Sequence, residues 1–309
     1  MTKTLFKKGI KETLLARHHL LKAIRDWFFQ NDFIEIDVHC SSEHAIPEAT
    51  IDLFEIEGNR FLLPSPEIYL KPLLAHDIPR FFHLGPAFRK GEKGRLHSHE
   101  FTMLEWYRAN ANYHQLITDC QNLLTHLASS LETHHPFASR PGLLACLSRP
   151  MEILTIEDAF VRFAGWNPLK ECDERRFEED LVLKVEPSLP GDRAVILKDF
   201  PWWAASLAKL DDKDPSVCQR LELYLCGVEL ANGFSELLDS REQRKRFEIE
   251  NQKRVQYGLD PIPIPEGFLH ALDNCPPSAG IALGIDRLLM ILIGASTIQE
   301  VLPTPFSED

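Results

Sequence analysis

Residues 88–108 read FRKGEKGRLHSHEFTMLEWYR, and the rest of the chain is interpreted from this stretch. An apolar run from Phe81 to Phe88 ends at Arg89, a charged loop with two glycines follows, and residues 101–108 return as an alternating segment. Two strands joined by a polar loop predict a β-hairpin. Side chains alternate between the two faces of a strand, so one face of the returning strand carries Phe101, Met103, Glu105 and Tyr107.

This face suits a base that stacks on an aromatic ring and an ammonium group that a carboxylate holds. Arg89 enters from the opposite strand, and its planar guanidinium is suited to a phosphate. An amphipathic hairpin with a solvated loop would give the same pattern. The choice between these interpretations depends on two further segments, residues 219–236 and 280–294.

The composition is typical of a soluble globular protein, with 309 residues, 44% hydrophobic and 26% charged. The chain has a formal net charge of −12 and therefore lacks the excess of basic residues that is typical of a strong nucleic-acid binder. The N-terminus has no apolar signal segment, and the most apolar run, 288–295, is far shorter than the ~20 residues that cross a bilayer. Seven cysteines without a C-x-x-C pair argue against a zinc site or a disulfide framework and predict a cytoplasmic protein.

Hydrophobic periodicity and turn signals divide the chain into helices and strands. Predicted helices cover residues 11–30, 66–76, 113–132, 156–163, 174–181, 240–257 and 286–294. Predicted strands cover 33–38, 51–57, 60–63, 81–88, 101–108, 194–198, 280–285 and, as a hairpin turning at Cys226-Gly227, 219–236. Residues 133–212 are patterned more weakly. We interpret them as an insertion packed beside the main sheet within one catalytic-type domain covering 1–309.

The hairpin at 219–236 is acidic on one face. A two-residue turn pairs Tyr224 with Glu229 and places Glu222 diagonally beside Glu229. Two such carboxylates favour Mg²⁺ carried in with a triphosphate, although a solvated acidic face is the common alternative. A strict period of two would turn Asn232 and Glu236 away from Glu229, and a bulge at Gly233 is predicted to re-aim them.

Arg287 is expected in the first turn of a helix that leaves a buried strand. The free N–H groups of a helix N-terminus favour anions, and an arginine there adds charge for a terminal phosphate. Since a cation in a first turn opposes the helix dipole, its presence calls for an anionic partner.

Together these segments resemble the catalytic domain of class II aminoacyl-tRNA synthetases. Arg89 with its loop and Phe101 is similar to the second motif of that family, GIALGIDR (280–287) to the third, and residues 16–38 to the first. SPEIYLK (65–71), EFTMLEWY (100–107) and ELANGFSEL (229–237) resemble lysyl-tRNA synthetases in particular. The resemblance implies an α+β fold, an antiparallel sheet flanked by helices, and a homodimer. Val38 or His39 stands where the first motif usually ends in proline.

Lysyl-tRNA synthetases carry an N-terminal anticodon-binding domain, for which this chain is expected to have no room. It therefore resembles the short paralogues of lysyl-tRNA synthetase that attach (R)-β-lysine to a lysine of elongation factor P. Ala282 agrees, because those paralogues have alanine where the synthetases have glycine. The implied activity is a ligase that forms an aminoacyl-adenylate from ATP and (R)-β-lysine or lysine. The alternatives are a truncated synthetase that charges tRNA, which the acidic charge disfavours, and a non-catalytic regulatory subunit.

The resemblance also implies roles for individual residues. Arg89 would hold the α-phosphate of ATP and Arg287 the γ-phosphate, with Mg²⁺ on Glu222 and Glu229. The rest of the ATP site would come from Phe101 stacked on adenine, and from Glu92, His97, Leu230 and Gly284. The side-chain ammonium of the amino acid would be bound by Glu67, Tyr107 and Glu236, with its second amine near Glu105, its carboxylate near Asn232, and Ser65 and Ala282 nearby. These buried carboxylates are expected to have no partner without substrate, which favours discrimination against neutral side chains.

Overall fold

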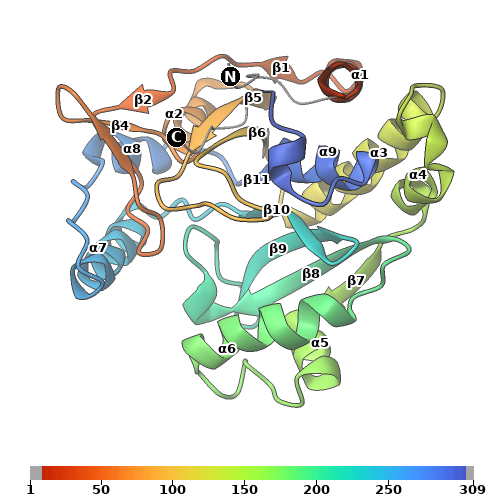
Figure 1. Cartoon of the computed structure of the whole chain (residues 1–309). Coiled ribbons are helices and arrows are strands. Elements are labelled where there is room, and N and C mark those ends of the chain that lie inside the picture. The colour runs from red at the N-terminus through yellow and green to blue at the C-terminus, as the bar shows by residue number, and fades with distance from the viewer. Residues whose placement is uncertain (1–8, 304–309) are drawn as a thin grey trace, which may run out of the picture.

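One large sheet organises the fold, as the computed structural model in Figure 1 shows for residues 9–303, the part of the chain that the structure describes. Its strand order is β1-β5-β6-β11-β10-β9-β8-β7, and the pairs are antiparallel except β1–β5 and β7–β8. The strands are β1 (Ile34–Glu35), β5 (Arg80–Phe88), β6 (Glu100–Ala109), β7 (Glu152–Thr155), β8 (Ala194–Pro201), β9 (Val217–Leu225), β10 (Val228–Ser235) and β11 (Ser278–Gly284). A small second sheet contains β2 (Ser41–Ser42), β3 (Phe54–Ile56) and β4 (Arg60–Leu62).

The helices lie around this sheet. They are α1 (Ile10–Gln30), α2 (Glu67–Leu70), which continues as the 3₁₀ helix η1 (Lys71–His76), α3 (Tyr113–Leu131), α4 (Pro141–Ser148), α5 (Ile156–Phe163), α6 (Glu174–Asp180), α7 (Ser240–Gln256), α8 (Glu266–Leu272) and α9 (Ile285–Ile293). Within residues 9–303, no helix has the length and apolar character needed to span a bilayer. The predicted α+β fold is confirmed, with helices flanking a sheet that is mixed and mostly antiparallel.

The main core fills one face of the sheet. Helices α1, α3, α4 and α9 cover this face (Figure 1) and bury side chains such as Phe28, Leu124 and Leu289 against it. On β6, Leu104 and Trp106 point into this core. The alternate residues therefore point to the opposite face, as the period of two predicted.

Two further groups of helices flank that opposite face. The helices α5 and α6 pack on β8 through aromatic contacts among Phe160, Phe177 and Phe200. The helices α7 and α8 join the α2 region through Phe247, Phe268 and residues near them. The open strip of sheet between the two groups is where the candidate residues gather.

The region 133–212 supplies β7 and β8, the last two strands of the large sheet, besides α4, α5 and α6. Helices α5 and α6 and strand β8 begin at the predicted residues 156, 174 and 194. Whether it is an insertion relative to the family stays a prediction.

Several predicted boundaries were wrong in detail. The strand predicted over 33–38 is reduced to Ile34–Glu35, because only these residues pair with β5. Proline was expected at the first position of the helix that follows Ser65. Pro66 instead precedes it, and the Ser65 hydroxyl accepts a hydrogen bond from the Glu67 N–H at 3.0 Å.

A buried ion pair fixes the start of α9 against the sheet. Arg17 on α1 binds the carboxylate of Asp286, which also accepts a hydrogen bond from the Thr102 N–H at 2.6 Å. These contacts join α1, β6 and α9, the three elements predicted to correspond to the family motifs. The helix turn that carries Arg287 is thereby held in position.

Candidate active site

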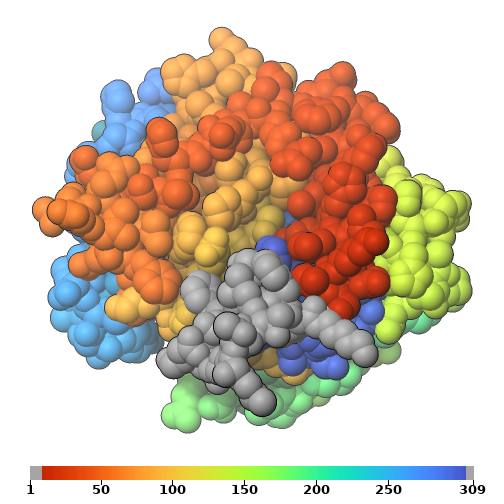
Figure 2. Space-filling model, turned by 45° about the horizontal axis from the view of Figure 1, so that its top comes forward, coloured from red at the N-terminus to blue at the C-terminus, as the bar shows by residue number. Residues whose placement is uncertain are grey.

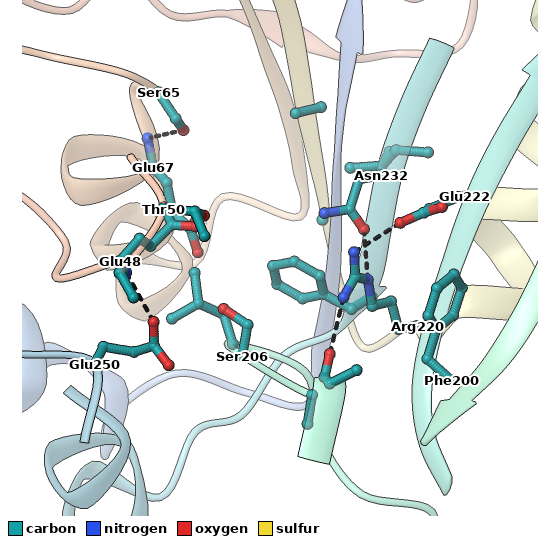
Figure 3. A pocket seen from close by; sticks show the side chains of 18 of the residues that line it. Glu48, Thr50, Ser65, Glu67, Phe200, Ser206, Arg220, Glu222, Asn232 and Glu250 are labelled. Atoms are coloured by element: carbon teal, nitrogen blue, oxygen red, sulfur yellow. Dashed lines mark hydrogen bonds and ion pairs between the residues drawn. The ribbon is translucent and has the colours of Figure 1, made fainter. Parts of the chain in front are cut away.

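The open strip of sheet forms the floor of a cavity of about 390 Å³. Figure 3 shows its two sides: Ser65, Glu67 and Glu48 come from the α2 side, and Arg220, Glu222 and Asn232 rise from the sheet. Of the predicted site residues, the cavity lining contains Ser65, Glu67, Arg89, Glu105, Tyr107, Glu222, Asn232 and Ala282. Half of the predicted residues, from four separate segments of the sequence, thus converge on one cavity.

Strand register explains this convergence. Glu105 on β6 pairs with Ala282 on β11, Ala282 pairs with Asn232 on β10, and Asn232 pairs with Glu222 on β9. Directly opposed residues point to the same face of a sheet. Four predicted residues therefore form one row across the cavity floor. The neighbouring row contains Tyr107, Gly280, Phe234 and Arg220.

The row depends on a bulge whose predicted position was wrong. Tyr224 pairs with Glu229 as predicted, but the register shifts between Glu229 and Ala231 and not at Gly233. The extra residue lets both Glu229 and Asn232 face the cavity side. Glycine is required at 233 for another reason, since a Cβ there would overlap the side chain of Ile281 on the neighbouring strand.

One end of the cavity contains buried carboxylates. Glu105 accepts hydrogen bonds from the Tyr107 hydroxyl at 2.6 Å and from the Ser65 hydroxyl at 2.7 Å. Glu236 is buried beyond Gly280, where a Cβ would overlap both the Glu236 carboxylate and the Tyr107 ring. Glycine at 280 therefore allows these two side chains to meet above β11.

Glu67 and Glu236 were expected to have no partner without substrate, and this expectation was wrong. The ammonium of Lys71, whose side chain is 0% exposed, binds Glu67 and lies 2.6 Å from Glu236 Oε2. Burial alone would lower the pKa of Lys71, but the charges of Glu236 and Glu67 outweigh it and raise that pKa. The chain thus supplies one cation of its own to the acidic end.

That single cation does not balance three carboxylates. Burial, followed by the charge of Glu67, raises the pKa of Glu105 to about 8. Burial also raises the pKa of Glu236 to about 8, although the charge of Lys71 opposes the shift. The acidic end therefore favours additional cations or protons.

Arg220 is a site residue that the sequence reasoning missed. Its guanidinium donates to Asn232 Oδ1 at 3.1 Å, to Glu222 Oε1 at 2.7 Å and to the carbonyl of Ala204 at 2.8 Å (Figure 3). It therefore brings a fixed positive charge beside Asn232. Its signal was present, because Arg220 precedes Glu222 by two residues on one strand and must share its face.

Lys71 and Glu48 were also missed. Lys71 follows Glu67 by four residues, a spacing that places two helical side chains together. Glu48 lies in a segment without helix or strand, and burial raises its pKa to about 7. No pattern in the sequence indicated that this loop would reach the cavity.

The predicted phosphate residues lie in two clusters. Arg89 is 3.3 Å from Glu92, and its guanidinium lies 5.4 Å from the ring centre of Phe101. Arg287 binds Glu229 at 3.2 Å and His97 Nε2 at 2.8 Å. The two clusters are neighbours, because charges from both act on His97. Burial, followed by the charge of Arg287, lowers the pKa of His97.

Leu230 and Gly284 lie beside Arg287, but they differ in what they could offer to a ligand. The Leu230 side chain is buried in the core, so only its backbone can face a ligand. A Cβ at Gly284 would lie 3.8 Å from the Leu230 carbonyl and from Arg287 Cδ, so a small side chain would fit there. Whether these residues bind ATP stays a prediction.

The donor set fits Mg²⁺ only together with phosphate oxygens. Across the part of the chain that the structure describes, no three His, Cys, Asp or Glu side chains gather closely enough to hold a metal by themselves. Glu222 accepts hydrogen bonds from Arg220 and from the Tyr224 hydroxyl at 2.6 Å, and Glu229 is bound by Arg287. Mg²⁺ is commonly held by one or two carboxylates plus substrate phosphates. Glu222 and Glu229 would provide the two carboxylates.

Nearly the whole sequence is similar to known proteins. Residues 2–308 match the family described as class II tRNA synthetases (D, K and N). The chain is 34% identical to an elongation factor P–(R)-β-lysine ligase of Hamiltonella defensa, with 94% of both chains covered. It is 35% identical to ligases of the same name from Klebsiella pneumoniae, with 94% of this chain and 93% of the relative covered, and from Vibrio parahaemolyticus, with 96% of both.

Proposed function

This chain belongs to the class II tRNA synthetases of the aspartate, lysine and asparagine group, and from that premise we propose that it is an ATP-dependent ligase. It activates (R)-β-lysine, or lysine, as an aminoacyl-adenylate and transfers the acyl group to a lysine side chain of elongation factor P. The relatives whose length it matches almost completely carry this activity in their name. The acidic end of the cavity carries the proposal, because it suits an amino acid with two ammonium groups.

Activation requires the amino acid and ATP to meet on the cavity floor. A carboxylate oxygen of the amino acid attacks the α-phosphorus, forms an acyl–phosphate bond and displaces pyrophosphate. Arg89 would stabilise charge on the α-phosphate, while Phe101, Glu92 and His97 would position the adenine end. Arg287 would hold the γ-phosphate. Catalysis of this kind depends on positioning and on neutralising charge that develops in the transition state.

Mg²⁺ belongs to the proposal as a partner of ATP. Glu222 and Glu229 would hold it together with phosphate oxygens, and the ion would supply positive charge to the departing pyrophosphate. Glu229 would have to leave Arg287 for this purpose. The same triphosphate that brings the ion would take over the guanidinium.

The acidic end of the cavity and the row of residues across its floor would together recognise the amino acid. Glu67, Tyr107 and Glu236 would bind the side-chain ammonium, and Glu105, held by Ser65, the second amine. Asn232, beside the fixed charge of Arg220, would face the carboxylate. Ala282 lies between Glu105 and Asn232 in this row, so its methyl group would limit the space for the amine nearest the carboxylate.

Transfer would need an uncharged acceptor amine to attack the acyl carbon, forming an amide bond and releasing AMP. The cavity lining includes the exposed Glu174 and Glu178 and the partly buried Glu250, which would attract a basic segment around the acceptor lysine. This surface and the net charge of −12 disfavour a polyanion such as tRNA. An acceptor that belongs to translation implies a cytoplasmic protein.

A homodimer is proposed from an exposed apolar strip. Figure 2 shows α1 lying on one face of the molecule. Its Leu14, Leu15 and Phe29, with Ile34 of β1, are between 42% and 53% exposed. Large apolar side chains exposed along one helix and the strand after it would suit an interface with a second copy of the chain.

Amino-acid-dependent exchange of pyrophosphate into ATP tests the activation step. Lysine and (R)-β-lysine should support exchange far better than methionine or leucine, because a neutral side chain leaves buried carboxylates without a cation. Equal exchange with leucine and lysine would rule out the proposed substrate class.

A further inference from the structure

Lys71, buried behind the acidic end of the cavity, has no role in the proposed function. Its side chain is fully buried, at the junction of α2 and η1. Its ammonium lies between Glu67 and Glu236 and within 5.3 Å and 5.6 Å of the ring centres of Phe234 and Phe268. A lysine is almost never fully buried unless its charge is compensated.

The arrangement around Lys71 is incomplete. Glu236 has a 0% exposed side chain, and its second oxygen, Oε1, has no hydrogen-bond partner. This oxygen lies above Gly280, beside the Tyr107 ring. A buried carboxylate oxygen without a donor carries a desolvation cost that a bound ammonium would remove.

A count of charges describes what is missing. Glu67, Glu105 and Glu236 supply three negative charges when ionised, and Lys71 supplies one positive charge. Glu67, Glu105 and Lys71 are also the charged groups that act most strongly on Glu236. The group is therefore short of two cations, which is the number of amines in a diamino acid.

We propose that Lys71 is a positioning residue that acts as a built-in cation: it holds Glu67 and Glu236 together and leaves the acidic end short of two positive charges. The inference rests on the proposed function and deepens it, because it makes Lys71 part of the selection of diamino acids. Lys71 acts through the two carboxylates and does not itself bind the substrate.

Lys71→Ala with chemical rescue tests this directly. The substitution removes three methylenes and the ammonium, so n-propylammonium matches the missing part, and n-propanol is its neutral counterpart. The KM for lysine in pyrophosphate exchange should rise about tenfold or more, as for loss of a charge-assisted hydrogen bond, with a smaller change in kcat. Propylammonium should restore the KM in a saturable way, and propanol should not. In the wild type, propylammonium should only compete weakly with lysine.

Melting temperature supplies a readout that does not depend on the reaction. Propylammonium should raise the Tm of Lys71→Ala, and propanol should not. Lys198→Ala is the matched control, because Lys198 is a partly buried lysine whose carboxylate partner, at 2.5 Å, is Asp199 and not Glu67 or Glu236. It should show neither the KM change nor the rescue.

Three results would overturn the inference: a KM for lysine within twofold of the wild type, equal rescue by amine and alcohol, or no effect of the amine on either KM or Tm. If Lys71→Ala does not fold, the Tm without amine is measured instead on Lys71→Met combined with Glu236→Gln, which removes one cation and one anion. This double variant should fold, and failure to do so would contradict the charge-balance role. Failure of the wild type to activate any diamino acid would instead refute the proposed function. The effect of propylammonium and propanol on the Tm of Lys71→Ala would still test the role of Lys71.

Discussion

The guanidinium of Arg287 binds the carboxylate of Glu229 at 3.2 Å. The residue proposed to hold the γ-phosphate and a residue proposed to hold Mg²⁺ are therefore direct partners. A triphosphate with its ion would give each of them a new partner at the same time. This exchange couples the arginine and the carboxylate, so variants of either should affect use of ATP.

Replacing Arg89 or Arg287 with alanine should reduce pyrophosphate exchange by about 10²–10³, a typical cost of removing one group that stabilises transition-state charge. Circular dichroism and Tm should stay close to those of the wild type, because both side chains are partly exposed and neither belongs to the hydrophobic core. Arg175→Ala is the control, since that side chain is 89% exposed. Near-native exchange in both cavity variants would exclude the proposed enzymatic activity.

The double change Glu222→Gln and Glu229→Gln should remove exchange together with its response to Mg²⁺. An amide oxygen is a weaker ligand for a hard cation than a carboxylate. The measurement is a titration of exchange with Mg²⁺, and Glu171→Gln, on an exposed side chain, is the control. A double variant that kept the wild-type Mg²⁺ response would mean that these glutamates have only their internal partners, Arg220, Tyr224 and Arg287.

Glu236→Gln should raise the KM for lysine sharply while leaving the KM for ATP nearly unchanged. The loss corresponds to roughly 1.5–3 kcal/mol, the usual contribution of a hydrogen bond to a charged group. Glu157→Gln is a matched control, because it alters a carboxylate that accepts from Asn167 at 2.6 Å on α5. An unchanged preference for lysine over leucine in Glu236→Gln would remove Glu236 from the ammonium site.

The raised pKa values of Glu105 and Glu236 predict how stability depends on pH. Both pKa values are about 8, against an ordinary value of 4.5, so between these pH values the folded protein keeps protons that the unfolded chain has lost. Unfolding then becomes easier as pH rises towards 8. Added lysine should reverse this trend, because its ammonium groups replace the protons.

Melting curves with and without lysine from pH 6 to 8.5 check this prediction. The increase in Tm caused by lysine should be larger at pH 8 than at pH 6. The double variant Glu105→Gln and Glu236→Gln should lose this pH dependence. A lysine effect that is the same at every pH in the wild type would contradict it.

The parts of the site that follow from local patterns could be predicted from sequence. The hairpin at β5 and β6, the face shared by Met103, Glu105 and Tyr107, and the helical position of Arg287 all follow from strand alternation and helix starts. Tyr224 opposite Glu229 follows from a two-residue turn, in which Cys226 and Gly227 both have positive φ.

The other parts of the site depend on contacts between distant residues, which the periodicity of a sequence does not predict. The bulge after Glu229 changes strand register without any glycine to mark it, and Gly233 was mistaken for its signal. The pairing of Lys71 with Glu236 joins residues 165 positions apart, through burial that only the folded chain creates. Glu48 reaches the cavity from a loop whose path is set by tertiary contacts, such as the bond from the Ala49 N–H to Glu250 at 2.8 Å.

The central claim is that the acyl group passes to a protein lysine, and acylation of purified elongation factor P measures it most directly. The protein would be incubated with ATP, Mg²⁺ and labelled (R)-β-lysine, with elongation factor P and tRNA(Lys) as competing acceptors, and the products identified by intact mass. We predict a single added lysyl-type group on one lysine of elongation factor P, at a rate that falls as salt screens the exposed carboxylates that line the cavity. Efficient charging of tRNA(Lys), with elongation factor P left unlabelled under the same conditions, would contradict the account.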